Sequence, residues 1–435
     1  GAGIYSGKAY SGEAHSGEVY SGGGRLVQIK QPAVVRFTPL AAAADAPPAQ
    51  LTKLLHEIGG RSRWRGLNLH AAFRCAHQIP GGAPPGDPAR GEALLQAVLA
   101  SGLVPKNRID EQLLRDFGAT SAGSLAPISS FIGGFAAQEV LKSVTAKFTP
   151  LRQFLYWDAA QALPARRPSE AECAPRGDRY DGTRAVVGEA VLRKLREGRY
   201  FVVGAGALGC EWLKVLALLG AATADGHVPG HVPTPDGRVP TPGGHVLGHV
   251  HVTDMDSIER SNLNRQFLFR PGDVGKPKSS CAAEKCVELN PSFRITAHEA
   301  RVGASEASTP FTSLFWDSLD AVINALDNVD ARLFVDRMCV RHRKPLLESG
   351  TSGTKANTQV ILPFLSASYG ASVDPPDDAI PVCTLKTFPY LIEHCVQWAR
   401  DLFDGEFRQS PAAVNAWLAD GGRALRAGIP GGGAR

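Results

Sequence analysis

Short apolar runs alternate along the chain with stretches in which apolar positions recur every three or four residues, a pattern typical of strands alternating with amphipathic helices. Residues 200–203 form a β-branched and aromatic run, as in a buried strand. Gly204, Gly206 and Gly209 follow directly, and residues 208–219 then place apolar side chains at helical spacing, up to another glycine. The pattern predicts a strand, a glycine-containing turn and a helix.

Glycines at such a turn let the backbone approach a phosphate and let the helix N-terminus point at it. The alternative is a tight turn that binds nothing. A second predicted strand, 249–253, ends at Asp254, where a Rossmann-like unit keeps an acid for the ribose hydroxyls. Its separation from the glycines is longer than the usual ~20 residues. The cause is a repetitive His/Val/Pro/Gly tract, 225–248, which we expect to be an inserted surface loop.

Polar and cationic residues follow the second strand. Asn264, Arg265 and Gln266 are consecutive, and Lys278 comes after a turn that contains proline and glycine. Such groups suit a triphosphate whose charge must be neutralised during reaction, and they do not suit hydride transfer. A solvated loop would explain the arginine and the lysine singly, but it explains the whole cluster less well.

A third predicted strand begins at residue 319 and leads to Asp327 and Asn328. In an open α/β sheet, ligands bind beyond the carboxyl ends of the strands. We therefore expect Asp327 near the same crevice, where its carboxylate is suited to a magnesium ion. The predicted fold class is α/β, with a Rossmann-like nucleotide-binding domain.

Other patterns lie outside this region. Edge or connecting strands are predicted at 25–37, 153–158 and 357–364. Helical patterns separated by glycine and proline predict a small bundle at 48–58, 67–77, 91–100 and 110–117. We expect His70, Cys75 and His77, in this bundle, to lie on a helix surface rather than to form a metal site.

A helix is also predicted within 125–142, where Gly133, Gly134, Ala136 and Ala137 would allow close packing against another element. The N-terminal repeat of residues 5–24 is polar and rich in glycine, so it cannot bury a core and we expect disorder there.

Two cysteines near the C-terminus contrast with each other. Cys395 belongs to the apolar stripe of a predicted helix, so we expect it in a core. Cys383 lies just before the N-terminus of that helix and close to Lys386, where a thiolate is favoured. It is therefore a candidate nucleophile, although buried or unreactive cysteines are common.

Composition limits the possible functions. The 435 residues suffice for about three domains, and the net charge of +5, from 47 basic and 42 acidic residues, is spread along the chain. This does not favour a nucleic acid or an anionic membrane as partner. The eight cysteines include no C-x-x-C pair, which predicts neither a zinc site nor a disulfide framework and favours a reducing compartment.

Several long segments carry a resemblance to a known family. GAGALGCE, TDMDSIERSNLNRQFLFRPGDVGKPKS, NALDNVDAR and KPLLESGTSGTK resemble the active adenylation domain of the ubiquitin-activating enzymes. IPVCTLKTFP and IEHCVQWARDLF are similar to the catalytic-cysteine motif and to the helix after it. The similarity covers residues 131–407, interrupted by the His/Pro tract, and is far more specific than the glycine pattern.

The resemblance implies a Rossmann-like, ThiF-type adenylation domain with a small helical bundle before it and the start of a mainly helical catalytic-cysteine domain after it. The implied organisation is a disordered repeat (1–24), a remnant of the first cysteine-half domain (25–37), the bundle (38–122), the end of an inactive adenylation half (123–168), the active adenylation domain (169–370) and the start of the catalytic-cysteine domain (371–435).

The resemblance also implies the site and its partners. Cys383 would form a thioester with ubiquitin, and Asp327 would be the metal ligand. The implied contacts for ATP and Mg²⁺ are Gly204, Gly206, Ala207, Gly209, Asp254, Asp256, Asn264, Arg265, Gln266, Lys278, Asp327 and Asn328. The implied partners are ubiquitin, or a ubiquitin-like modifier, and the ubiquitin-conjugating enzymes, with a monomeric chain in the cytoplasm and nucleus.

Alternatives remain open. Compared with the family, the chain lacks the first part of the inactive half, with an arginine that reaches the ATP site, and most of the family's sequence beyond Phe407, so we expect an incomplete chain. It is then either an activating enzyme or an inactive fragment that only binds ubiquitin or another partner. A nicotinamide-dependent oxidoreductase is opposed by the polar groups around Arg265 and Asp327.

Overall fold

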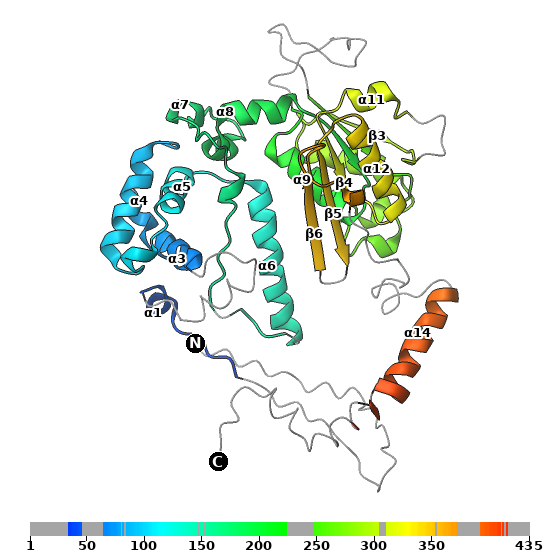
Figure 1. Cartoon of the computed structure of the whole chain (residues 1–435), viewed down its shortest axis with the longest axis horizontal. Helices are drawn as coiled ribbons and strands as arrows, with labels where there is room; N and C mark the ends of the chain where they lie inside the picture. The colour runs from blue at the N-terminus through cyan, green and yellow to red at the C-terminus, as the bar shows by residue number, and fades with distance from the viewer. Residues whose placement is uncertain are drawn as a thin grey trace. The chain divides into compact units, whose positions relative to one another are not determined.

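The computed structural model describes residues 34–45, 64–79, 81, 84–146, 148–151, 153–223, 248–303, 310–352, 355–371, 392–409, 411–412 and 415 (Figure 1). Most of these residues, from Arg36 to Gly350 and onward from Asn357, form one compact unit, and α14 (Ile392–Asp404) belongs to a second. The N-terminal repeat, the predicted helix 48–58, the inserted loop as far as residue 247, and Cys383 lie outside the described residues. The domain bounds given above stay predictions.

A six-stranded sheet has the order β3-β2-β1-β4-β5-β6. β1 pairs in parallel with both β2 and β4, while β3 pairs in parallel with β2 and β5 with β4. The chain thus adds strands on one side of β1 and then returns to add strands on the other, which makes the sheet doubly wound. The α/β prediction is confirmed. The strands are β1 Arg199–Val203, β2 His249–Thr253, β3 Ile295–His298, β4 Ala321–Asn324, β5 Leu346–Ser352 and β6 Lys355–Ile361.

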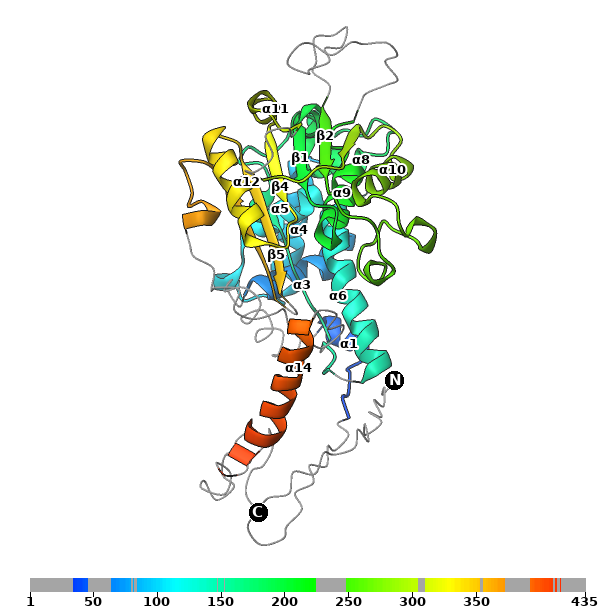
Figure 2. The same ribbon diagram turned by 90° about the vertical axis from the view of Figure 1, so that its right-hand side faces the viewer.

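Helices cover both faces of the sheet. Figure 2 shows α9 (Ala207–Leu219) and α10 (Lys278–Leu289) on one side and α11 (Ser313–Asp317) and α12 (Val329–Arg341) on the other. Val202 joins the core beneath α9 and α10, whereas its neighbours Phe201 and Val203 join the core beneath α12. Because β1 is buried on both faces, its apolar run is continuous rather than alternating.

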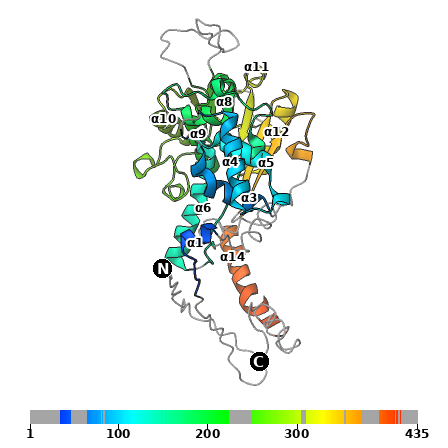
Figure 3. The same ribbon diagram turned by 90° about the vertical axis from the view of Figure 1, so that its left-hand side faces the viewer.

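A separate group of helices precedes the sheet, with the bounds α1 Leu40–Asp45, α3 Arg65–Cys75, α4 Pro88–Ser101 and α5 Glu111–Thr120. α3, α4 and α5 contact one another around a core that includes Leu94 and Leu114 (Figure 3). Asp110 caps α5, since its side chain accepts a hydrogen bond from the backbone N–H of Leu113 at 3.1 Å. The helices predicted at 67–77, 91–100 and 110–117 are confirmed.

The expectation that His70 and Cys75 lie on a helix surface is wrong. Both are buried, and only His77 is exposed. The His70 imidazole is within hydrogen-bond distance of the Tyr156 hydroxyl (3.0 Å) and of the Ala44 carbonyl oxygen (2.8 Å). These contacts join α3 to α1 and to a later extended segment, so the histidine has a structural role.

α6 (Ala126–Thr145) confirms the predicted helix but not its close packing. None of its residues is buried, and a Cβ atom placed on Gly133 or Gly134 would meet nothing within 4 Å. The small residues therefore face open space in the described part of the chain. α7 (Glu170–Cys173) and α8 (Asp181–Glu197) follow and lead into β1.

The strand predicted at 153–158 is wrong, because these residues are irregular and form no ladder with any described strand. Most of the strand predicted at 25–37 lies outside the described residues, and its described part, residues 34–37, is irregular. The apolar run within 153–158 instead packs on helices, because Tyr156 stacks on Phe73 of α3 with ring centroids 5.5 Å apart. The last strand is confirmed with shifted bounds, since β6 runs over Lys355–Ile361.

α14 is amphipathic, as the sequence predicts, but its apolar side chains are exposed in the structure. Ile392, Trp398 and Phe403 are among them, and Cys395 is also exposed. The expectation that Cys395 lies in a core is therefore wrong for the described residues, because nothing among them covers this face of the helix.

Single-turn helices also occur at Ala76–Gln78, Lys106–Arg108, Ala160–Ala162, Arg260–Asn262, Pro271–Asp273, Tyr369–Ala371 and Gly405–Gln409. Among the described helices, none combines the length and the apolar composition that crossing a membrane requires.

Candidate functional site

The turn between β1 and α9 depends on two of its glycines for close backbone packing. Gly204 has φ +100°, and its N–H donates to the Thr253 carbonyl oxygen at 2.8 Å. A Cβ atom on Gly209 would lie 2.1 Å from the Gly204 carbonyl oxygen, so the first turn of α9 lies directly against the end of β1. Glycine is thus required at 204 for its conformation and at 209 for space.

Gly206 differs from the other two. A Cβ atom there would meet nothing within 4 Å, and no side chain caps the helix that begins at Ala207. The first N–H groups of an α-helix have no partners within the helix, and the helix dipole favours negative charge at this end. The backbone at Gly206 and Ala207 therefore fits a phosphate group, as the sequence predicts.

Asp254 braces this turn from the end of β2. Its carboxylate accepts hydrogen bonds from the backbone N–H of Ala205 at 2.7 Å and of Asp256 at 2.9 Å. Burial raises the pKa of Asp254, and these two backbone donors oppose that rise. The residue predicted to bind ribose thus also fixes the glycine turn to the next strand.

We expect Asp254→Ala to lower the free energy of unfolding by about 2 kcal/mol, because the buried Ala205 N–H loses its acceptor. Chemical denaturation measures the change. Asp327→Ala is the matched control, since that exposed carboxylate makes no such contact among the described residues and its loss should leave the unfolding free energy unchanged. Equal losses in both variants would contradict the bracing role.

Lys278 and Asp256 lie next to Asp254. The Lys278 ammonium pairs with the Asp256 carboxylate at 2.8 Å, and the Lys278 N–H donates to the Asp256 carbonyl oxygen at 2.9 Å. Lys278 is the first residue of α10 and is largely buried, whereas Asp256 is exposed. The Lys278 ammonium is therefore already held in place, and an anionic ligand could replace the exposed Asp256 carboxylate as its partner.

The segment with Asn264, Arg265 and Gln266 packs against α9, because the following Leu268 and Phe269 join the core beneath that helix. Asn264 and Arg265 are exposed, and the Arg265 guanidinium donates to the Asn264 side-chain oxygen at 3.1 Å. Gln266 is 4% exposed, and its side-chain oxygen has no hydrogen-bond partner among the described residues. The cluster is thus divided between an exposed pair and a buried amide.

Asp327 and Asn328 lie in the loop between β4 and α12. Asn328 caps α12 by accepting a hydrogen bond from the Ala331 N–H at 2.8 Å, and the Ala325 N–H ties the loop to the Val203 carbonyl oxygen at 2.8 Å. Asp327 is exposed. The described residues contain no group of three or more side chains that could hold a metal ion, so Asp327 offers a single carboxylate, which suits a magnesium ion carried by phosphates.

A buried polar network beneath this loop was not predicted. The Asn324 side chain donates to the Glu348 carboxylate at 2.7 Å, and the other oxygen of Glu348 pairs with Arg332 at 3.2 Å. Burial raises the pKa of Glu348. The sequence signal for this network is a glutamate, Glu348, within the apolar pattern of KPLLESG. A buried charge at such a position is costly unless it has a partner, so its presence indicates one.

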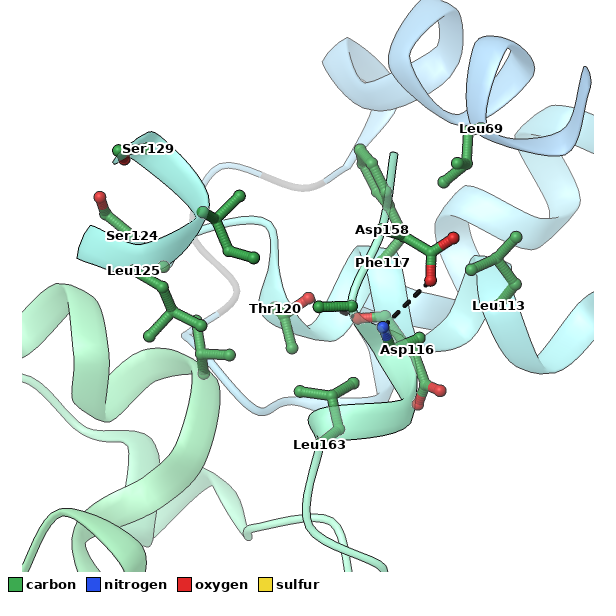
Figure 4. A pocket seen from close by; sticks show the side chains of 15 residues that line it. Leu69, Leu113, Asp116, Phe117, Thr120, Ser124, Leu125, Ser129, Asp158 and Leu163 are labelled. Carbon is green, nitrogen blue, oxygen red and sulfur yellow. Dashed lines mark hydrogen bonds between the residues drawn. The ribbon is translucent and has the colours of Figure 1, made fainter. Parts of the chain in front are cut away.

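A pocket of about 330 Å³ lies elsewhere, between α3, α5, the start of α6 and the segment near Leu163 (Figure 4). Its two acids already have partners, since Asp158 pairs with Arg65 and Asp116 pairs with Arg167, each at 2.8 Å. None of the predicted site residues lines this pocket.

The predicted nucleotide-site residues that the structure describes thus follow the carboxyl ends of β1, β2 and β4. Cys383 lies outside the described residues, so its role and distance from this edge stay predictions.

Similarity to known proteins agrees with this geometry. A model described as the ThiF family matches residues 180–419. The chain is 46% identical over 409 residues to "Ubiquitin-like modifier-activating enzyme 1" of Homo sapiens, covering 92% of this chain and 36% of that protein. It is 49% identical over 323 residues to "Ubiquitin-activating enzyme E1 1" of Schizosaccharomyces pombe, covering 74% of this chain and 30% of that protein.

Among solved structures, one described as "Crystal structure of E. coli MccB + MccA-N7isoASN" aligns with 46% of this chain and 53% of that chain, with a TM-score of 0.35 and 19% identity. The family match and the two relatives, by contrast, cover most of the described elements. The chain therefore belongs to the ThiF family and is a homologue of the ubiquitin-activating enzymes, spanning 36% of the length of the human relative.

Proposed function

We propose that this chain carries the part of a ubiquitin-activating enzyme that adenylates the C-terminal carboxylate of ubiquitin and begins its transfer to a cysteine. The observation that carries the proposal is the open backbone at Gly206 and Ala207, placed beside Asp254 and Lys278. This arrangement fits a nucleoside triphosphate, and the chain resembles enzymes named for activating ubiquitin.

In this proposal the glycine turn receives the ATP phosphates, and Asp254 and Asp256 lie near the ribose. Lys278 and Arg265 neutralise phosphate charge, and Asn264 and Gln266 supply polar contacts. Asp327 would hold Mg²⁺ near the phosphates, with Asn328 beside it, and the ion would neutralise charge on the phosphate oxygens. The protein contributes position and charge, which are the main requirements of phosphoryl and adenylyl transfer.

The reaction has two steps. A carboxylate oxygen of the last glycine of ubiquitin attacks the α-phosphorus of ATP, and pyrophosphate leaves. The Cys383 thiolate then attacks the carbonyl carbon of the acyl adenylate, and AMP leaves as the thioester forms. A ubiquitin-conjugating enzyme accepts the acyl group next. We place the monomeric chain in the cytoplasm and nucleus, as the resemblance to the ubiquitin-activating enzymes implies.

The test is a non-reducing gel after incubation of this chain with ubiquitin and magnesium-ATP, next to Cys383→Ala. We expect an ATP-dependent ubiquitin adduct that dithiothreitol removes and that the variant lacks, because only a thioester requires both the nucleotide and the thiol. Cys395→Ala is the matched control and should keep the adduct.

Folded wild-type protein that binds ATP but forms no adduct would contradict self-sufficient activation and would favour a fragment that only binds ubiquitin. An adduct with a different ubiquitin-like modifier, and none with ubiquitin, would overturn the choice of substrate alone.

A further inference from the structure

Arg332 on α12 contacts the loop that carries Asp327. Two nitrogens of the Arg332 guanidinium, Nε and Nη2, donate to the Leu326 carbonyl oxygen at 3.2 and 2.6 Å. The third, Nη1, pairs with Glu348 at 3.2 Å. One planar group therefore joins the residue just before Asp327 to a buried carboxylate on β5.

The surroundings leave room for a guanidinium and for little else. A Cβ atom on Gly350 would lie 2.8 Å from Nη1 and 3.0 Å from Nη2 of Arg332, so the neighbouring strand approaches the group as closely as glycine allows. The Tyr369 ring lies on another side, with its centroid 6.0 Å from the guanidinium carbon. Glu348 is 2% exposed, and its other oxygen accepts a hydrogen bond from the side chain of Asn324, the last residue of β4.

Every residue of the loop except one gives an atom to this framework. Ala325 donates its N–H to β1, Leu326 accepts from Arg332, and Asn328 caps α12. Asp327 is exposed, and its side chain makes no hydrogen bond or ion pair with any described residue. A carboxylate left uncommitted on an otherwise tied loop is what a ligand-binding position requires.

A simple structural ion pair is the competing explanation. Buried ion pairs are weak evidence for stability, since well-packed apolar residues often replace them without loss. Here, however, two of the three guanidinium nitrogens of Arg332 donate to the Leu326 carbonyl oxygen of the loop rather than to the carboxylate. The Glu348 carboxylate also accepts a hydrogen bond from Asn324 at the end of β4. The contacts converge on the loop and not on the hydrophobic core.

We propose that Arg332, oriented by Glu348, is a positioning residue that holds the Leu326–Asn328 loop so that the Asp327 carboxylate meets the magnesium ion of bound ATP. The inference rests on the proposed function, since it needs magnesium-ATP at this edge of the sheet. Arg332 touches neither ATP nor metal in this role. Its loss therefore weakens binding that depends on magnesium and leaves binding of the metal-free nucleotide nearly unchanged.

Titration calorimetry of the full chain with ATP, in Mg²⁺ or in EDTA, tests the proposal. Arg332→Met should lower the affinity for magnesium-ATP about tenfold and change that for ATP in EDTA less than about twofold. Arg332→Lys keeps one donor for the Leu326 carbonyl and should recover part of the loss. Arg337→Met removes an exposed arginine of the same helix and should match the wild type.

Arg332→Met leaves the Glu348 charge unpaired, so the double variant Arg332→Met/Glu348→Gln provides a folded comparison and should show the same selective loss. Folded variants that keep the wild-type gain from Mg²⁺ would overturn the positioning role while leaving the proposed function intact. A wild-type chain that binds no ATP in either buffer would overturn the proposed function, and the positioning role with it.

Discussion

Gly209→Ala is expected to destabilise the protein by about 3 kcal/mol, a large share of the ~5–15 kcal/mol by which a typical folded protein is stable. The added Cβ atom would lie 2.1 Å from the Gly204 carbonyl oxygen. Neither side can yield, because the end of β1 is hydrogen-bonded to β2 and the neighbouring Cys210 is fully buried. Urea denaturation followed by circular dichroism measures the loss.

Gly206→Ala is the matched comparison in the same turn. Gly206 has φ −74° and open space around its Cβ position, so alanine should leave the unfolding midpoint nearly unchanged. The methyl group would, however, occupy the place where a phosphate approaches the backbone, and we expect the affinity for ATP to fall about tenfold. A folded Gly206→Ala protein with wild-type affinity would show that this turn does not bind the phosphates.

Stability is expected to fall steeply as the pH drops below 6.5, because three histidines on β2 and β3 are held neutral. His251 and His298 have ring nitrogens 3.1 Å apart, and the His249 ring lies 4.7 Å from that of His251. Burial lowers the pKa of His249 to about 4, that of His251 to about 3, and that of His298 as well. The unfolded chain, in which these histidines titrate near 6.5, therefore binds more protons.

Each such histidine removes about 1.4 kcal/mol per pH unit from the unfolding free energy between pH 6.5 and its folded pKa. Above pH 6.5 the contribution is fully present. His251→Leu should reduce this slope by the share of one histidine, measured by urea denaturation between pH 7 and pH 5. His77→Gln, which changes an exposed histidine, should retain the wild-type slope. Equal slopes for His251→Leu and wild type would contradict the role of these three histidines.

Features encoded by neighbouring residues could be predicted from the sequence. The strand, turn and helix around Gly204 follow from local periodicity and from glycine spacing, and Asp254 follows from its place at the end of a strand. Asp327 and Asn328 follow in the same way. Each of these predictions needs only one element and the rule that parallel strands end at a common edge.

Features that depend on distant pairing could not be predicted. The contact between Arg332 and Glu348 exists because β4 and β5 pair in the register of Val322 with Leu346. The pattern of residues 153–158 resembles a strand, but a strand also requires a neighbour to accept its hydrogen bonds, and the described residues supply none. The same limit applies to α6, whose small residues indicate close packing but do not say against what.

The strand order has a consequence for how the chain folds. The chain between β1 and its partner β2 includes residues 224–247. The carbonyl oxygen of Arg199, the first residue of β1, also accepts a hydrogen bond from the Asp320 N–H, so both partners of β1 come from far along the chain. Pairing strands that are distant in sequence slows folding. The entropic cost of closing the loop between them, however, grows only logarithmically, by about 0.6 kcal/mol for each doubling of loop length. Thr223 bridges to Phe293, and His249 bonds to Gly198, so both sides of the tract are anchored. Its length can therefore change greatly in evolution at almost no thermodynamic penalty.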